Sequence, residues 1–344
     1  MNFKVTVDPS GHRFSVNAQE SVLAAALRSG LAFPYGCRNG VCGACKGKVV
    51  QGEVHYPQLQ PAALSETEAA IGQALFCCAV PKSDLVLEVH EIAASSELPI
   101  RKMPARVERL EPLAEDVMRL FLKLPEGERM QFLAGQYIDI VLPDGRHRSF
   151  SIANAPHDDA LLELHVRRIA GGRFTGHVFS EMKEKDILRI EGPFGRFYLR
   201  EDSPRPLLFL AGGTGFAPIK GIIEHALAEG VDRAMTLYWG ARDKQDLYLD
   251  GLARQWSAAA GFEYIPVLSA PRPDDGWSGR TGYVHQAVLD DVADVNGYDV
   301  YISGPPEMVD AARQAFFDRG LPEDQLYFDS FEFAGDSAGD DVTS

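Results

Sequence analysis

The 344-residue chain contains no run of about 18 consecutive apolar residues, the length that a membrane-spanning helix needs. Residues 1–7 alternate apolar and polar side chains like a strand, which is not the pattern of a signal sequence. Positive charge is also scarce, because 34 Lys and Arg stand against 49 Asp and Glu, for a net charge of −15. Residues 203–344 hold most of this excess, with 10 basic and 23 acidic side chains. An acidic chain of this kind argues against nucleic acid or an anionic membrane as partner.

Cysteine is rare as well, with five residues in the chain, but the spacing of four of them is informative. Four residues separate Cys37 from Cys42, two separate Cys42 from Cys45, and Cys77 follows after 31 more. This is the spacing of the ligands of a plant-type ferredoxin [2Fe–2S] cluster. Small residues in the loop allow the backbone to approach the cluster and to direct N–H groups at the sulfurs. The sequence therefore predicts an iron–sulfur site with these four ligands.

A zinc site and a set of disulfides are the alternatives for these cysteines. Zinc sites usually bring CxxC pairs together or combine them with histidines, and this chain has a single CxxC. A disulfide framework is typical of short secreted domains. Cys77 is followed directly by Cys78, and residues 75–81 resemble the Leu-Thr-Cys-Ala-Ala-Tyr-Pro run of plant ferredoxins, which selects Cys77 and leaves Cys78 as a small buried residue. Free cysteines and a cluster motif favour a cytoplasmic location.

Residues 1–92 show the order of elements that is typical of the β-grasp fold of ferredoxins. Strands are expected over residues 3–7, 12–16, 46–54 and 85–90, with a helix over residues 21–27 that ends at Gly30. Residues 93–102 are small and polar with a proline, which predicts a short linker. We expect the cluster domain to stay close to the segment that follows it.

Residues 103–202 are rich in short strands separated by Gly, Pro and Asp turns. The strands are expected over residues 105–110, 117–123, 136–141, 161–167 and 187–191, which favours a small antiparallel barrel. Within this segment, Arg148, Ser149, Phe150 and Ser151 resemble the Arg-x-Tyr-Ser motif of the ferredoxin–NADP reductase superfamily, with phenylalanine in place of tyrosine. The resemblance implies that the arginine binds a flavin pyrophosphate, the aromatic ring packs on the flavin, and Ser151 reaches its N5 region.

Two further motifs in this segment resemble the same superfamily. Gly172 and Thr175 match its second flavin-phosphate motif, and Thr175 is expected to cap the helix that follows. The run from Gly192 to Gly195 resembles its Gly-Pro-x-Gly turn. Each motif alone is also compatible with an ordinary surface strand or glycine turn. Their order and spacing together favour an FAD-binding barrel, with FMN as the alternative that the residues leave open.

Residues 203–333 have the pattern of a parallel nucleotide-binding sheet. The apolar run 206–210 predicts a strand buried on both faces, and a glycine turn and a helix over residues 219–229 follow it. More strands are expected over residues 234–239, 262–268, 299–303 and 326–331, with a helix over residues 309–318. The turn resembles the Gly-Gly-Thr-Gly-x-Ala-Pro loop by which this superfamily binds pyridine nucleotides, and the residues implied are Gly212, Gly213, Thr214, Gly215 and Pro218.

The end of the second strand bears on the choice of nucleotide. Arg242 suits a 2′-phosphate, whereas Asp243 suits a free 2′-hydroxyl, so the two residues point in opposite directions. Residues 246–248, Asp-Leu-Tyr, resemble NADH-dependent oxygenase reductases, which favours NADH with NADPH as the alternative.

Two motifs near the C-terminus concern the nicotinamide. Ser303, Gly304 and Pro305 resemble the start of the family's Cys-Gly-Pro-Pro-x-Met, whose cysteine faces the nicotinamide in relatives. The serine is expected to affect hydride transfer more than binding. Residues 326–331 resemble the strand that brings an aromatic residue and an acid near the flavin, here Phe331 and Asp329, although an edge strand of core aromatics has the same pattern. Residues 334–344 are small and acidic, and we expect disorder.

Taken together, the motifs indicate a multidomain α+β and α/β protein that resembles the reductase components of bacterial multicomponent oxygenases, such as phenol hydroxylase and benzoate dioxygenase, and the CDP-6-deoxy-glucoseen reductases. The resemblance implies that NADH electrons pass through FAD to the cluster and on to a partner protein, because the flavin can exchange electrons singly or in pairs. Ser151, Ser303 and Asp329 are the expected catalytic residues. A free-standing flavin or ferric reductase and a redox sensor are the other functions compatible with the motifs.

Overall fold

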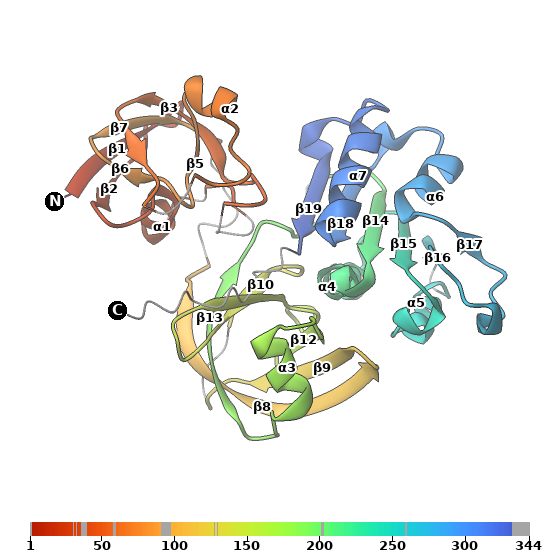
Figure 1. The fold of residues 1–344 in the computed structure, drawn as a ribbon. Coiled ribbons are helices and arrows are strands. Elements are labelled where there is room, and N and C mark those ends of the chain that lie inside the picture. The colour runs from red at the N-terminus through yellow and green to blue at the C-terminus, as the bar shows by residue number, and fades with distance from the viewer. Residues whose placement is uncertain are drawn as a thin grey trace. The chain divides into compact units, whose positions relative to one another are not determined.

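The computed structural model describes residues 2–29, 31, 33–35, 40–57, 60–90, 98–126, 128, 130–200, 203–258 and 260–331. Cys37, Gly30, the first half of the predicted 93–102 linker and the acidic tail lie outside the described residues. The last two residues of that linker, Arg101 and Lys102, belong to a strand, so the linker prediction is too long at its end. The chain forms two compact units, Met1–Pro99 and Ile100–Ser344 (Figure 1), and each is described by itself.

The first unit is a five-stranded mixed sheet with a helix packed on it. Its strands follow the order β2-β1-β7-β3-β5, with β1 and β7 parallel and the other neighbours antiparallel, as expected for a β-grasp fold. Alternate residues of β1 and β2, such as Val5, Val7 and Val16, are fully buried, and α1, which contacts β2, buries its own Leu23. The elements are β1 (Asn2–Asp8), β2 (Arg13–Asn17), α1 (Val22–Arg28), β3 (Lys46–Gln51), β4 (Val54–His55), α2 (Glu66–Ala70), β5 (Gln73–Leu75), β6 (Val80–Pro81) and β7 (Leu85–Glu88).

The second unit begins with a six-stranded antiparallel sheet that closes on itself. Its order is β11-β10-β13-β8-β9-β12, and the two edge strands meet where Ile152 pairs with Leu164 and Ala153 N–H donates to Glu163 O at 2.7 Å. This closure makes the predicted barrel. Helix α3 (Arg173–Ser180) packs on it through Phe174. The strands are β8 (Arg101–Ala114), β9 (Val117–Lys123), β10 (Tyr137–Val141), β11 (His147–Ser151), β12 (Leu162–Arg167) and β13 (Ile187–Phe194).

A parallel sheet of order β17-β16-β15-β14-β18-β19 completes the second unit (Figure 1). The apolar run of β14 is explained by burial on both faces, because Leu207 and Phe209 pack under α4 and α5 while Leu208 and Leu210 pack under α6 and α7. The elements are β14 (Leu207–Gly212), α4 (Phe216–Ala228), β15 (Met235–Ala241), α5 (Asp250–Trp256), β16 (Phe262–Leu268), β17 (Arg280–Thr281), α6 (Val284–Asp291), β18 (Asp299–Gly304), α7 (Pro306–Phe317) and β19 (Leu326–Ser330).

The strand order reverses at β14, since β15 lies on one side of it and β18 on the other. The carboxyl ends of strands at such a reversal form a crevice where doubly wound sheets bind their ligands. In this chain the crevice is bordered by the glycine turn after β14 and the loop after β18, which are the two segments that the sequence predicted to bind nucleotide.

Candidate functional site

The first candidate site is the cysteine loop of the N-terminal unit. Cys45 is buried, and Cys42, Cys77 and Cys78 are half-buried. The Cys77 and Cys78 sulfurs lie 3.5 Å apart. The pKa of the Cys77 thiol is raised well above its usual range, first by its hydrogen bond with Cys45, then by Cys78 and by burial. Thiols from the loop and from the distant segment therefore meet in space, as a shared metal cluster requires.

The backbone of the cysteine loop packs closely against the segments that carry Pro61 and Cys78. Gly40 has a φ of +82°, and a Cβ there would lie 2.8 Å from Pro61 Cβ and 2.9 Å from Cys78 Sγ. Only glycine adopts this conformation readily and leaves the necessary space. Cys78 thus packs against the loop backbone, whereas Cys77 contacts Cys45. This division of contacts fits a [2Fe–2S] cluster held by Cys77 together with Cys42, Cys45 and the predicted ligand Cys37, which is outside the described residues.

The second candidate site is the crevice of the parallel sheet, which begins at the glycine turn. Gly213 has a φ of +52°, and Trp239 Nε1 donates to its carbonyl oxygen at 3.0 Å. A Cβ on Gly212 would lie 2.4 Å from Met308 Sδ, and a Cβ on Gly215 would lie 2.0 Å from Ser303 O. The glycines therefore allow the turn to sit directly on the β18 loop. Buried Thr214 lies between them.

The two loops of the crevice touch through their backbones. A Cβ on Gly304 would approach Gly212 Cα and O to 3.0 Å, and Pro305 is the N-cap of α7. Pro218 lies in the first turn of α4, where its missing N–H breaks no helical hydrogen bond. The N-terminal amides of α4 thus follow a turn in which only Thr214 carries a side chain, which is the arrangement that binds phosphate groups.

Three predicted catalytic residues come together beside this crevice, although they belong to β11, β18 and β19. Ser151 Oγ donates to Asp329 Oδ2 at 3.2 Å, and Ser303 is the strand partner of Asp329. The Ser303 hydroxyl is fully buried and makes no hydrogen bond within the described part of the chain. A buried donor without a partner is costly, so this hydroxyl is suited to a bound ligand. Phe331 N–H donates to Gly304 O at 2.9 Å, which places Phe331 next to the same loop.

The Asp329 carboxyl has a perturbed ionisation, since burial raises its pKa to about 6 while the Ser151 hydrogen bond opposes the shift. A raised folded-state pKa means that the folded protein loses stability as pH rises from 3.8, the ordinary value, to about 6. We expect Asp329→Asn to raise the free energy of unfolding by up to about 3 kcal/mol at pH 8 and by about half as much at pH 5. Thermal unfolding at both pH values tests this, and a variant less stable than wild type by the same amount at both would contradict it.

The first flavin motif lies on β11, where it contacts the second. Arg148 is half-buried, and its Nη1 donates to the carbonyl of the preceding residue at 2.9 Å. Ser149 Oγ donates to Asp139 Oδ1 at 2.6 Å. The Phe150 ring packs against Phe174 of α3, with centroids 5.5 Å apart. The two motifs, distant in sequence, are therefore neighbours at the start of α3.

The prediction that Thr175 caps α3 is wrong. The N-cap is Gly172, which has no side chain to cap the helix, and Thr175 lies inside the first turn. Its Oγ1 donates to Gly172 O at 3.3 Å and accepts from Ile169 N–H at 3.1 Å. The hydroxyl therefore fastens the turn before the helix. The physical reason is the spacing, because a side chain three residues into the helix folds back on the turn and does not reach the free amides ahead of it.

Asp243 lies where β15 ends, as predicted, but its carboxylate already has partners. It is buried, accepts from Gln245 N–H at 3.1 Å and lies 3.4 Å from Arg272 Nε, while Arg242 is exposed. We expect Asp243→Ala to improve the use of NADPH relative to NADH by roughly tenfold, about 1.4 kcal/mol, because it removes a negative charge and frees Arg272 for a 2′-phosphate. Steady-state kcat/KM for both nucleotides measures the ratio. Exposed Asp274→Ala is the control, and an unchanged ratio in the Asp243 variant would rule out this role.

Arg167 is a candidate binding residue that sequence reasoning missed. It ends barrel strand β12, yet its guanidinium nitrogens lie 3.7–3.9 Å from the position of a Cβ on Gly213. Asp116 and Asp246 are 3.4 and 3.6 Å from it, and its Nε and Nη2 make no hydrogen bond within the described residues. A cation with free donors over the glycine turn fits a nucleotide phosphate. The sequence feature that could have pointed to Arg167 as a phosphate-binding residue is the pair of arginines before a glycine turn.

A buried ionic cluster fixes the barrel against the parallel sheet. Lys220 Nζ of α4 lies 3.1 Å from Glu163 Oε2 of β12 and 2.8 Å from Glu224, and His165 Nε2 lies 2.8 Å from Glu163 Oε1. His165 Nδ1 also lies 3.0 Å from the Tyr248 hydroxyl. Burial alone would raise the pKa of Glu163, but His165 and Lys220 together outweigh it and lower the pKa to about 2. This cluster positions α4, and with it the glycine turn.

The cysteine loop, the closed barrel and the parallel sheet with its glycine turn define an iron–sulfur flavoprotein reductase that uses a pyridine nucleotide. Family models agree, since residues 5–82 match the 2Fe-2S iron-sulfur cluster binding domain, residues 104–198 the oxidoreductase FAD-binding domain and residues 209–314 the oxidoreductase NAD-binding domain. Among the helices of the described residues, none has the length and apolar character to cross a membrane.

Relatives that match over nearly the whole of both chains define the family more specifically than the domain models do. The chain is 40% identical over 332 residues to the CDP-6-deoxy-L-threo-D-glycero-4-hexulose-3-dehydrase reductase of Yersinia pestis, covering 96% of this chain and 99% of the relative. It is 36% identical over 350 residues to the reductase component of phenol 2-monooxygenase from Pseudomonas sp. strain CF600, covering 100% and 98%. The crystal structure of the Amycolatopsis cytochrome P450 reductase GcoB matches with a TM-score of 0.83 and 35% identity, covering 97% and 100%.

The chain therefore belongs to the family of NAD(P)H-dependent electron-transfer reductases that combine [2Fe–2S], FAD-binding and NAD-binding domains. Its cofactors are a [2Fe–2S] cluster, FAD and NADH. Both groups of relatives that the sequence motifs resembled, the oxygenase reductases and the deoxysugar reductases, are represented among the matches.

Proposed function

We propose that this reductase delivers single electrons from its cluster to a separate partner enzyme, and that the partner is the oxygenase component of a multicomponent oxygenase. The observation that carries the proposal is the meeting of Ser151, Asp329 and Ser303 beside the glycine turn, in a chain that also holds a cysteine loop in a compact unit of its own. One site is thus built for the nicotinamide and flavin, and another for onward transfer.

FAD supplies the change from two-electron to one-electron chemistry when it is bound. Arg148 and the start of α3 hold its phosphates in this proposal, and the glycine turn with Arg167 holds those of NADH. Ser303 offers a buried hydroxyl to the nicotinamide side of the crevice. Asp329 Oδ2 accepts from Ser151 Oγ and, with a pKa of about 6, can hold a proton there. Gly215 packs directly on the backbone of Ser303, so the two loops meet at the floor of the crevice.

An anaerobic absorption spectrum of the holoprotein before and after NADH tests the relay. Bleaching of both flavin and cluster bands supports it. Flavin bleaching with an unchanged cluster spectrum would overturn it and would favour a flavin reductase with an attached sensor.

The partner needs its own experiment. A dehydrase is the second candidate, favoured by the 40% identity to the Yersinia reductase over nearly the whole of both chains. We expect the oxygenase component of a phenol 2-monooxygenase, supplied with phenol, to accelerate NADH oxidation. Acceleration by a CDP-hexulose dehydrase with its substrate, and not by the oxygenase, would replace the first candidate with the second. Equal turnover with free flavin as the only acceptor would contradict both.

Arg148 is the residue on which the proposed flavin site depends most. We expect Arg148→Ala to weaken FAD binding by about 10–100-fold, since a hydrogen-bonded charge on a phosphate contributes about 1.5–3 kcal/mol. The FAD-to-protein ratio after gel filtration, and a titration with FAD, measure the loss. Arg146→Ala is the matched control, because Arg146 precedes the same strand and pairs with Asp144 at 2.7 Å. FAD retention at the wild-type level in Arg148→Ala would remove this residue from the site.

A further inference from the structure

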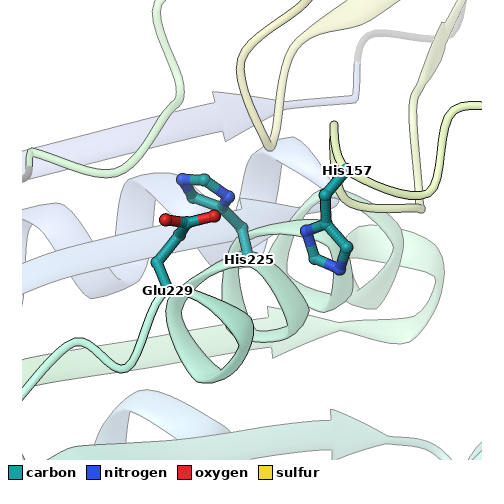
Figure 2. Close-up of side chains that lie close together, drawn as sticks. All are labelled: His157, His225 and Glu229. Atoms are coloured by element: carbon teal, nitrogen blue, oxygen red, sulfur yellow. The ribbon is translucent and has the colours of Figure 1, made fainter.

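Two histidines and a glutamate meet at the far end of α4, away from the glycine turn at its start (Figure 2). His225 and Glu229 are four residues apart, in the last turn and at the C-cap of the helix. His157 comes from the loop that leads from the barrel closure to β12. One side-chain nitrogen or oxygen from each lies within 4.8 Å of the others, the only such group of three found in the described part of the chain.

The donor set has the chemistry of a metal site. Two imidazoles and a carboxylate are ligands that Zn²⁺ takes in proteins, with a fourth position left for water. The spacing of four places His225 and Glu229 on one face of the helix. The rings of His157 and His225 are tilted by only 27°, with centroids 6.4 Å apart. His157 and Glu229 are exposed, so their side chains are able to rotate the short distance to a shared ion.

The backbone beneath these residues is held firmly, which favours a preformed site. Asn154 is buried, and its Nδ2 donates to Asp158 O at 2.6 Å and to Leu161 O at 3.1 Å, so it ties both ends of the His157 loop together. A Cβ on Gly221 of α4 would lie 3.0 Å from Asn154 O, which shows how closely the helix approaches the loop. Loop and helix therefore pack directly against each other.

The surroundings favour a cation. The C-terminal end of a helix carries partial negative charge, and His225 and Glu229 lie at that end of α4. Two further acids are neighbours of the ligands in the chain, since Glu224 directly precedes His225 and Asp158 directly follows His157. Lys220 Nζ, 2.8 Å from Glu224, is the facing positive group, and it is buried and already paired with Glu163.

We propose that His157, His225 and Glu229 bind one Zn²⁺ ion that connects the barrel loop to the end of α4. The site is separate from the cysteine loop and from the nucleotide crevice. Because α4 carries the glycine turn at its other end, the ion would stabilise the packing of the two halves of this unit and take no part in electron transfer.

The test uses the holoprotein with its cluster and FAD in place, dialysed against a chelator and then against buffered Zn²⁺. Zinc and iron per protein are measured by elemental analysis, and zinc affinity by isothermal titration. We expect one zinc per chain at unchanged iron content, with a higher midpoint of thermal unfolding. His157→Ala and His225→Ala should each weaken binding by more than tenfold, because loss of an outer partner alone costs about 10–100-fold.

The chain offers a matched control in His177 and Glu181, an exposed pair with the same spacing on α3, 3.2 Å apart, that belongs to no three-residue group within the described residues. His177→Ala should bind zinc like the wild type. Three results would overturn the proposal: no zinc bound by the wild type, equal affinity in the His225→Ala variant, or an equal loss in His177→Ala, which would indicate adventitious surface binding.

Discussion

Replacing Cys42 with serine should reduce electron transfer to a one-electron protein acceptor to the background rate, while NADH still bleaches the flavin. Cys42 lies in the described part of the cluster loop, and a serine oxygen is a poor substitute for a thiolate that ligates iron. The flavin and nucleotide sites lie entirely within Ile100–Ser344, a compact unit with its own cores. Loss of the cluster should therefore leave that unit folded and able to oxidise NADH.

Cytochrome c reduction and ferricyanide reduction separate the two steps. Both are one-electron acceptors, but the protein cytochrome c is expected to take its electron from the cluster, whereas the small ferricyanide ion also accepts directly from the flavin. We expect the variant to lose the first activity and keep the second, with iron content reduced. If both activities disappear while FAD remains bound, the two units depend on one another and the separation proposed here is wrong.

The adjacent cysteines provide a sharper control for the same experiment. Cys77 contacts Cys45, whereas Cys78 packs against the Gly40 backbone, so Cys77→Ser should behave like Cys42→Ser and Cys78→Ser like the wild type. Iron content and the visible spectrum report on the cluster directly. A variant pair with the opposite result would make Cys78 the ligand.

Much of the fold follows from local patterns in the sequence. The strict alternation in β1 and the continuous apolar run in β14 are different signals, and each corresponds to the burial observed, on one face for β1 and on two faces for β14. The expected strands over residues 117–123 and 262–268 have the bounds observed. Helices α2, α5 and α6 were not predicted, because each is only five to eight residues long and its apolar periodicity is weak.

Some residues of the candidate site were predictable from the sequence, and others were not. The glycine turn and the β18 loop were predictable because close backbone approach requires glycine at fixed positions. A Cβ added at Gly212 or Gly215 would lie too close to the neighbouring loop, so only glycine fits there. Arg167 was not predictable, because its place over the turn depends on how the barrel packs on the sheet. The same holds for His157 and His225, which are 68 residues apart and meet only through that packing.

The packing itself depends on Lys220, and we expect Lys220→Met to lower the free energy of unfolding by about 3–5 kcal/mol. The lysine is 4% exposed and donates to Glu163, Glu224 and the carbonyl oxygen of Ala153. Methionine fills a similar volume but removes the buried ammonium group from both Glu163 and Glu224, and leaves Glu163 with His165 at 2.8 Å and Arg119 at 3.9 Å. Burial of an unpaired charge is far more costly than the loss of a surface pair.

Lys102→Met is the matched control, because Lys102 is 68% exposed and pairs with Glu191 at 3.2 Å, which predicts a loss of no more than about 1 kcal/mol. Chemical unfolding followed by flavin fluorescence measures both variants. Adding Glu163→Gln to Lys220→Met should recover part of the loss, because the buried negative charge that Lys220 offset is then gone. The buried ionic cluster around Lys220 positions α4 and the glycine turn at its start. The Lys220→Met variant should therefore also raise the KM for NADH. An equal loss in the Lys102 and Lys220 variants, or no recovery in the double variant, would show that the buried charges do not hold the barrel against the sheet.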